Sequence, residues 1–346
     1  MAAKFPQRKI GDDFVSKIGL GCMGMSISLT PGTTNDDEEN LRVLTAAADM
    51  GINLWVTSDW YGPYTNERLL GRWFKETGRR DEIFLVTKFG SRLIDGKMLV
   101  CGTPEYVREA CEGSLQRLGV DRIDLYMQHR VDPETPIEKT VEAMAQLKKE
   151  GKVRYLGLSE CSARTLTRAH KVHPIAAAEM EFSPFAMDIE SPDTDFLKTA
   201  RELGVKIIAY SPLGRGFLTG AVKSRDDFDK NDIRLKVHPR FSKENFPGNL
   251  KLVEAIAAVA KEKGCTPSQL ALAWVLAQGD DFIPIPGTKH IKYLKDNAGA
   301  VSVEFTKKDE KRVRDAIESV GGAKGARYPE GHMAHLFGDT PEFDAQ

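Results

Sequence analysis

The chain has 346 residues, of which 41% are hydrophobic and 29% charged, so it can bury a sizeable core and nothing forces a second domain. Its 49 Lys and Arg nearly balance its 50 Asp and Glu, which excludes a strong overall field for nucleic acid or an anionic membrane. The five cysteines are widely spaced and odd in number, so a reduced, metal-free chain is expected. No signal core opens the sequence and no window reaches the roughly 18 apolar residues of a membrane helix, so we expect a cytoplasmic protein.

Short β-rich segments alternate with longer amphipathic segments along almost the whole chain. Helices are expected between the strands; several end in Gly, and Thr103-Pro104 and Thr266-Pro267 are typical of an N-cap followed by proline. Eight such units in one chain predict a closed (β/α)8 TIM barrel, in preference to an open doubly wound sheet. We expect one domain over residues 1–346. The expected strands cover residues 17–23, 53–59, 83–89, 123–129, 153–159, 175–181, 206–212 and 282–288.

Gly19, Gly21 and Gly24 match the pattern GxGxxG of dinucleotide-binding turns. In that fingerprint the glycines end a strand and open a helix directly. Here the first convincing helix starts only near Asp36, after an intervening loop. The sequence therefore disfavours a Rossmann-type turn.

Three ionisable residues follow or end successive strands: Tyr61, Lys88 and His129. Taken alone, Tyr61 could be a rim residue packed on Trp60, and His129 a satisfied core histidine. Lys88 is more informative, because it ends an apolar strand where a buried ammonium is costly without a partner. Since the C-terminal ends of barrel strands meet at one mouth, the three predict an active site there, with Tyr61 as a proton donor.

Two loops have the composition of a phosphate site. Residues 211–220, SPLGRGFLTG, follow the seventh strand, and small residues there let backbone N–H groups approach an anion, although a flexible hinge is the alternative. Residues 286–290, PGTKH, follow the eighth strand and open a helix, where barrels often hold phosphate. A long charged loop from Leu213 to about Asn249 is expected to be functional or disordered. The tail, 321–346, is expected either to cover a pocket or to be a loosely ordered terminus.

The order and spacing of these motifs resemble the aldo-keto reductases, especially the branch of the pyridoxal and perakine reductases. The resemblance runs from about Lys9 to Thr340 and rests on WVTSDWYG, GPYTNERLLG, VTKFG, DLYMQHRVD, YLGLSE, EFSPF, YSPLGRGFLTG and IPIPGTKH. It implies a (β/α)8 barrel that binds NADPH across its C-terminal mouth and reduces an aldehyde or ketone.

The resemblance also implies roles for particular residues. Tyr61 would be the acid, Lys88 would tune it and His129 would orient the carbonyl. Ser159 and Glu179 would face the nicotinamide carboxamide, and Tyr210 would stack on the ring. Thr288, Lys289 and His290 would meet the 2′-phosphate, and Asp296 and Asn297 the adenine. The cofactor-binding residues implied are Met23, Ser159, Glu179, Tyr210, Ser211, Pro212, Leu213, Gly214, Gly216, Gly287, Thr288, Lys289, His290, Asp296 and Asn297.

Two positions depart from the family pattern. Val56 stands where the family has the Asp that pairs with the lysine, so we expect Lys88 to lack a counter-ion and to have a depressed pKa. Asp59 is three residues further on, and strand alternation points it to the other face. Glu179 stands where the family usually has Gln, and a carboxylate cannot donate to the carboxamide oxygen.

Three functions follow from the pattern. The first is an NADPH-dependent carbonyl reductase acting on a small-molecule substrate, with activity altered by Val56 and Glu179. The second keeps the barrel but performs isomerisation, cyclisation or elimination with Tyr61, His129 and Glu179 as acid and base. The third is a nucleotide-binding regulatory subunit. The sequence leaves the substrate and the oligomeric state open.

Overall fold

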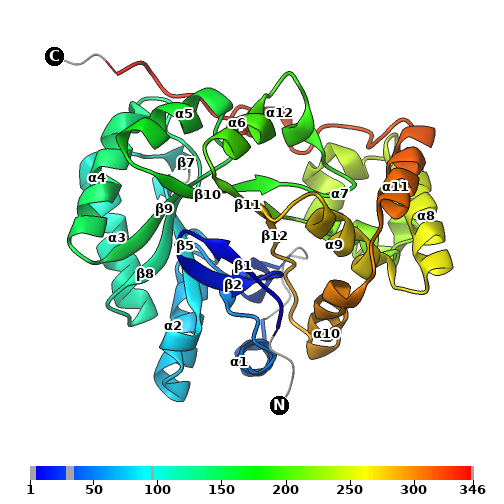
Figure 1. Cartoon of the computed structure of the whole chain (residues 1–346), viewed down its shortest axis with the longest axis horizontal. Helices are drawn as coiled ribbons and strands as arrows, with labels where there is room; N and C mark the ends of the chain where they lie inside the picture. The colour runs from blue at the N-terminus through cyan, green and yellow to red at the C-terminus, as the bar shows by residue number, and fades with distance from the viewer. Residues whose placement is uncertain (1–4, 29–34, 95–96, 344–346) are drawn as a thin grey trace.

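A computed structural model describes residues 5–28, 35–94 and 97–343, and it contains a parallel eight-stranded sheet (Figure 1). The strands follow the order β3-β4-β5-β8-β9-β10-β11-β12. A parallel bridge between Gly21 and Gly287 joins the first strand to the last, so the sheet closes. The (β/α)8 barrel predicted from the sequence is confirmed. The barrel strands are β3 (Leu20–Gly21), β4 (Leu54–Val56), β5 (Phe84–Phe89), β8 (Ile123–Gln128), β9 (Val153–Ser159), β10 (Ile175–Glu181), β11 (Lys206–Tyr210) and β12 (Phe282–Pro284).

The closure explains the glycines of the GxGxxG match. Gly19 N–H donates to the Pro284 carbonyl at 2.9 Å and Gly21 N–H to the Pro286 carbonyl at 3.3 Å. A Cβ at Gly21 would lie 2.8 Å from the Ile285 carbonyl oxygen, closer than real Cβ contacts. These two glycines therefore let the first and last strands approach, and the Rossmann interpretation is wrong, as the sequence context indicated.

Helices surround the strands, and their ends follow the sequence signals. The Thr103 side chain accepts from Tyr106 N–H, and Thr266 forms a capping box with Gln269, as the two Thr-Pro pairs predict. In the described part of the chain no helix is long and apolar enough to cross a membrane. The helices are α1 (Asp37–Asp49), α2 (Thr65–Thr77), α3 (Pro104–Leu118), α4 (Ile137–Lys149), α5 (Ala163–Val172), α6 (Phe196–Glu202), α7 (Ile233–Val237), α8 (Phe246–Lys263), α9 (Pro267–Ala277), α10 (Ile291–Gly299), α11 (Lys307–Ser319) and α12 (Glu330–Met333).

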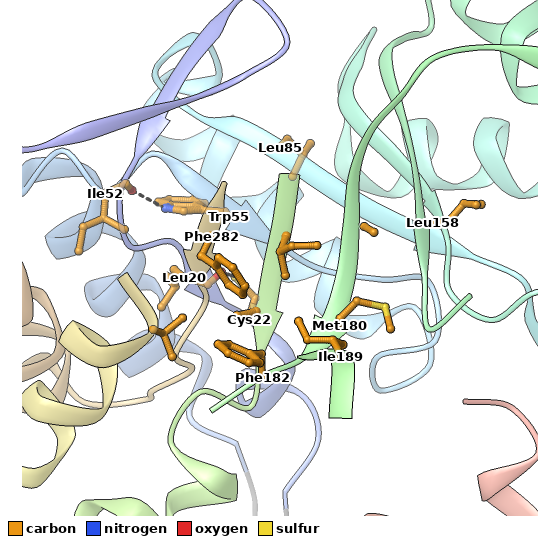
Figure 2. Close-up of a cluster of buried hydrophobic side chains, with 14 of the residues drawn as sticks. Leu20, Cys22, Ile52, Trp55, Leu85, Leu158, Met180, Phe182, Ile189 and Phe282 are labelled. Carbon is orange, nitrogen blue, oxygen red and sulfur yellow. Dashed lines mark hydrogen bonds between the residues drawn. The ribbon is translucent and has the colours of Figure 1, made fainter. Parts of the chain in front are cut away.

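Alternation along the strands divides the side chains between two cores. Trp55 and Leu85 point outward and pack between strands and helices, where the Trp55 indole donates to the Ile52 carbonyl at 2.8 Å (Figure 2). Their neighbours Val56 and Val86 belong to a second cluster that fills the barrel. Two residues further along a strand the same inward face recurs, so Lys88 continues the row begun by Val86.

An N-terminal hairpin, which the sequence analysis did not predict, lies across the ring of strands (Figure 1). It consists of β1 (Gln7–Ile10) and β2 (Asp13–Ser16), and Ile10 and Val15 join the cluster inside the barrel. A second hairpin, β6 (Ser91–Ile94) and β7 (Lys97–Val100), follows β5. Both strands of the first hairpin are only four residues long, too short for a clear periodic signal.

The loop after β11 is folded, not disordered. It contains α7 and several 3-10 turns, and Phe217, Phe228 and Phe241 are buried. The Phe217 ring lies 5.4 Å from Phe241 and 5.2 Å from Phe246, centroid to centroid. Isolated phenylalanines among many charges gave no periodic pattern, so the sequence left open whether this loop is functional or disordered.

Candidate active site

The structure brings Tyr61, Lys88 and His129 together at the C-terminal end of the barrel. The Lys88 ammonium lies 5.1 Å from the centre of the Tyr61 ring, and the Tyr61 and His129 rings are 5.8 Å apart in an edge arrangement. Lys88 and His129 stand two residues beyond the inward-facing Val86 and Met127, whereas Tyr61 enters from the turn after β4. Convergence therefore follows from alternation on two strands and one tight turn.

Burial sets the protonation of the two rings. Burial is the main cause that raises the pKa of the Tyr61 phenol, with Glu179 adding to it, while Lys88 opposes the rise. Burial, and then Lys88 and Arg130, hold the pKa of His129 well below its usual value. His129 is therefore neutral near pH 7, and its Nδ1 lies 3.2 Å from the Ser58 hydroxyl. A neutral imidazole and a protonated phenol can both donate a hydrogen bond to one oxygen.

Lys88 has a counter-ion, which corrects the expectation drawn from Val56. Its ammonium donates to the Glu179 carboxylate at 3.0 Å, and both side chains are buried. Burial alone would lower the pKa of Lys88, but Glu179 and Tyr61 outweigh it and raise the pKa above its ordinary value. The expected depressed pKa is therefore wrong, because the carboxylate comes from β10 and not from β4.

Asp59 does not take part in this pair. Its carboxylate accepts from the Ser58 hydroxyl at 3.4 Å. Burial, and then the neighbouring Glu67, raise the pKa of Asp59 to about 8, although Arg117 opposes the rise. Folding therefore favours the protonated form of this side chain.

Asp59→Asn is expected to alter the pH dependence of stability. The raised pKa means that the folded chain holds a proton which the unfolded chain releases above about pH 4, so native stability falls as pH rises from about 4 to about 8. Asparagine carries no such proton, so the stability of the variant relative to the native chain should rise by about 4 kcal/mol between pH 5 and pH 8.5, since about three pH units separate pH 5 from the raised pKa. Urea unfolding of both chains at pH 5 and pH 8.5 measures it. An equal difference in stability between the two proteins at both pH values would contradict the raised pKa of Asp59.

The residues expected to bind a cofactor lie along the same mouth. Ser159 and Glu179 are register partners on β9 and β10, and the Ser159 hydroxyl accepts from Arg130 at 3.3 Å. Tyr210 ends β11, and its hydroxyl donates to Glu160 at 2.9 Å. Met23 begins the short 3-10 turn after β3. Their contacts with a nicotinamide stay predictions.

After β11 the backbone turns through an unusual run of left-handed residues. Ser211, Gly214, Arg215 and Gly216 all have positive φ, between 49° and 87°. Such turns expose consecutive backbone N–H groups on one side. Within the described residues the buried Arg215 Nη2 has no hydrogen-bond partner, while its guanidinium lies 4.8 Å from the Tyr328 ring centre. An unsatisfied buried cationic donor fits a site for an anionic group. Pro212 and Leu213 belong to the same turn.

The residues expected at the far end of a dinucleotide surround the start of α10. Gly287 bridges Gly21, and Thr288 Oγ1 accepts from His290 N–H at 3.0 Å. The Lys289 ammonium lies 3.5 Å from the Asn35 side-chain oxygen. Asp296 contacts the Thr266 hydroxyl at 3.2 Å, whereas Asn297 is buried. A lysine and a helix N-terminus together favour a phosphate group.

A buried ion cluster that was not predicted from the sequence lies beside the site. Arg327 in the tail donates to both Glu160 oxygens, at 3.1 and 3.0 Å, and also to Glu181 at 3.4 Å. Further along, Gly338 bridges Cys161, so the tail runs across the ends of β9 and β10. Glu160 directly follows β9 and could have been singled out by the rule that selected Lys88. Arg327 lies in the tail, away from any predicted strand end, so no sequence pattern indicated it.

A separate hollow of about 640 Å³ opens at the opposite, N-terminal end of the barrel. Its lining includes Asp13, Arg80, Asp124 and Arg154, whose charges are paired with one another. None of the residues expected to be catalytic or to bind a cofactor lines it. This hollow is therefore distinct from the candidate active site. It lies at the N-terminal face, whose residues in (β/α)8 barrels generally contribute to stability and not to catalysis.

The fold and the site together define a (β/α)8 barrel enzyme whose ionisable groups meet at the C-terminal mouth. A model of the Aldo/keto reductase family matches residues 17–318. The chain therefore belongs to the aldo/keto reductase family and is an oxidoreductase of that family.

Two relatives and one solved structure support this family membership. The chain is 50% identical over 338 residues to aldo-keto reductase yakc of Schizosaccharomyces pombe, whose name specifies NADP(+), covering 97% of this chain and 98% of the relative. It is 51% identical over 343 residues to aldo-keto reductase str7 of Strobilurus tenacellus, with the same coverage. The glycerol dehydrogenase AKR11B4 of Gluconobacter oxydans superposes with a TM-score of 0.83 at 28% identity, covering 94% of this chain and 98% of that one.

Proposed function

We propose that this protein is an NADPH-dependent reductase of small aldehydes or ketones, with Tyr61 as proton donor. The observation that carries the proposal is the cluster of buried Tyr61 and Lys88 with half-buried His129, in which the ammonium lies 5.1 Å from the phenol ring centre. Family membership supplies the reaction class, and a 50% identical relative named for NADP(+) supports the cofactor.

The residues present fit an extended dinucleotide phosphate. The left-handed turn at 211–216 and the unpartnered Arg215 Nη2 suit a pyrophosphate. Lys289 at the start of α10 suits a further phosphate, which distinguishes NADP from NAD. When bound, NADPH would supply the hydride.

The side chains of this protein would handle the proton. As the carbonyl oxygen gains negative charge, the Tyr61 hydroxyl donates its proton to it, giving the alcohol and a phenolate. The Lys88 ammonium stabilises the phenolate, and the neutral His129 holds the carbonyl oxygen by a hydrogen bond. Solvent then returns a proton to Tyr61.

The native protein is expected to consume NADPH with a panel of small aldehydes and ketones, and NADH much less effectively. Loss of absorbance at the nicotinamide band measures turnover with each dinucleotide, and chromatography identifies the alcohol. Product without NADPH consumption would favour isomerisation, cyclisation or elimination instead. Tight NADPH binding without any turnover would favour a nucleotide-binding regulatory role.

The non-reductive alternative uses Tyr61, His129 and Glu179 as acid and base. In this structure the Glu179 carboxylate accepts from Lys88 at 3.0 Å, which favours the reductive proposal because the ammonium stays charged. A charged lysine beside a tyrosine favours proton donation to an alkoxide, which hydride transfer requires.

A further inference from the structure

The ion pair between Lys88 and Glu179 joins two strands across the interior of the barrel. β5 and β10 are separated by β8 and β9 in the sheet order. The two residues are 91 positions apart in the sequence, and their side chains are 0% and 4% exposed. A buried ammonium without an anion is strongly unfavourable, so this contact is needed if Lys88 is to remain charged.

The neighbouring strand β4 (Leu54–Val56) carries no acidic residue that could pair with Lys88. Val56 on β4 is a register partner of Val86, two residues before Lys88 on the same inward face, and it is 1% exposed. A longer side chain at position 56 would therefore point into the barrel interior beside the row that carries Lys88, and Glu179 reaches the ammonium from β10. Relative to the family pattern described above, an acid is absent at the first position and present at the second, so the number of carboxylates is unchanged.

We propose that Glu179 is a positioning residue which keeps Lys88 cationic beside Tyr61, and that one carboxylate, from position 179 or from position 56, is what the site requires. Glu179 acts through Lys88 and does not itself exchange a proton with the substrate. This proposal rests on the proposed function for its kinetic part, whereas its structural part concerns the ion pair alone.

The charged and titratable groups around Lys88 define what a pH profile would report. Glu179 comes from β10, Tyr61 from the turn after β4, and His129 and Arg130 from the segment directly after β8. Cys22 after β3 also interacts with Lys88 electrostatically. Removing Glu179 leaves the buried Lys88 ammonium with Tyr61 as its remaining favourable partner, so burial then lowers the pKa of Lys88. Lys88 would then lose its proton at lower pH, so the alkaline limb of kcat should move to lower pH.

Three variants test the proposal: Glu179→Gln, Val56→Asp, and the double variant Val56→Asp/Glu179→Gln. Glu179→Gln should lower kcat by about tenfold or more, with the alkaline limb moved to lower pH. The double variant should recover most of kcat and return the limb toward its native position. Val56→Asp alone places two carboxylates against one ammonium, so kcat should fall and the limb should move to higher pH.

A stability cycle on the same proteins separates this proposal from the proposed function. Glu179→Gln should lower the midpoint of urea unfolding, and the double variant should raise it again, whether or not any carbonyl is reduced. Glu138→Gln is the matched control, since it removes a carboxylate that binds Arg168 at 2.8 and 2.7 Å outside the barrel. It should lower the midpoint without moving the pH profile.

Two results would overturn the inference. One is a double variant no more stable and no more active than Glu179→Gln, since position 56 would then be unable to supply the carboxylate. The other is a Glu179→Gln protein with native stability and a native pH profile. If the native chain reduces nothing, the proposed function fails, and the stability cycle alone decides whether the carboxylate is exchangeable.

Discussion

Tyr61→Phe is expected to lower kcat for carbonyl reduction by about 10²- to 10⁴-fold, the range that a positioned general acid contributes. Phenylalanine keeps the ring that packs 5.8 Å from His129 and 5.1 Å from the Lys88 ammonium. Only the hydroxyl that carries the proton is lost, so the affinity for NADPH should change little. Steady-state turnover together with cofactor titration by fluorescence separates the two quantities.

Tyr64→Phe provides the matched control. Tyr64 lies in the same turn before α2, but its ring is 45% exposed and packs under the Arg117 guanidinium at 4.4 Å. The same loss of one hydroxyl there should leave kcat within about twofold, since exposed substitutions away from special features have small effects. A Tyr61→Phe enzyme with near-native kcat would show that another group donates the proton.

Arg327→Met is expected to destabilise the protein by about 3–5 kcal/mol, the cost of leaving a buried charge without its partner. Arg327 binds both oxygens of Glu160, which is 0% exposed. Burial would raise the pKa of Glu160, but Arg327 and Arg130 outweigh it and hold the pKa below its ordinary value. Without Arg327, the unfolded chain hydrates this carboxylate better than the folded one.

The measurement compares this variant with Arg108→Met in urea unfolding at pH 7. Arg108 holds Glu150 with the same two-point geometry, at 2.8 and 2.7 Å, but the two side chains are 46% and 36% exposed. The loss of Arg108 should cost far less stability than the loss of Arg327, because water replaces the partner of Glu150. Equal effects from the two arginines would mean that the Glu160 site is open to solvent after removal of Arg327.

Loss of Arg327 should also change the hydrogen bonds of Tyr210 in the candidate active site. Tyr210 donates to the same Glu160 oxygen that accepts from Arg327, and Tyr328 in the tail lies 3.4 Å from the Tyr210 hydroxyl. The tail and the end of β11 therefore share one hydrogen-bonded cluster. A change in KM with little change in kcat would indicate that the cluster shapes the mouth and not the proton transfer.

The barrel, and the meeting of Lys88 and His129 at one of its ends, were predictable because they depend on local periodicity. Alternation along a strand determines which residues face inward, and parallel strands end at one mouth, so Lys88 and His129 could be assigned to the same place. The N-terminal hairpin could not, since strands of four residues carry no periodic signal of their own. The packing of Phe217 and Phe241 in the long loop was missed for the same reason.

What the sequence determined by itself is the set of inward-facing positions and the chemistry that each strand end carries. Only the tertiary structure decided which of these groups pair. Lys88 meets Glu179 across 91 residues, and Glu160 meets Arg327 across 167. The physical reason is that a buried charge takes whichever opposite charge the closed barrel brings within reach, and no local pattern records a contact made through the interior of the fold.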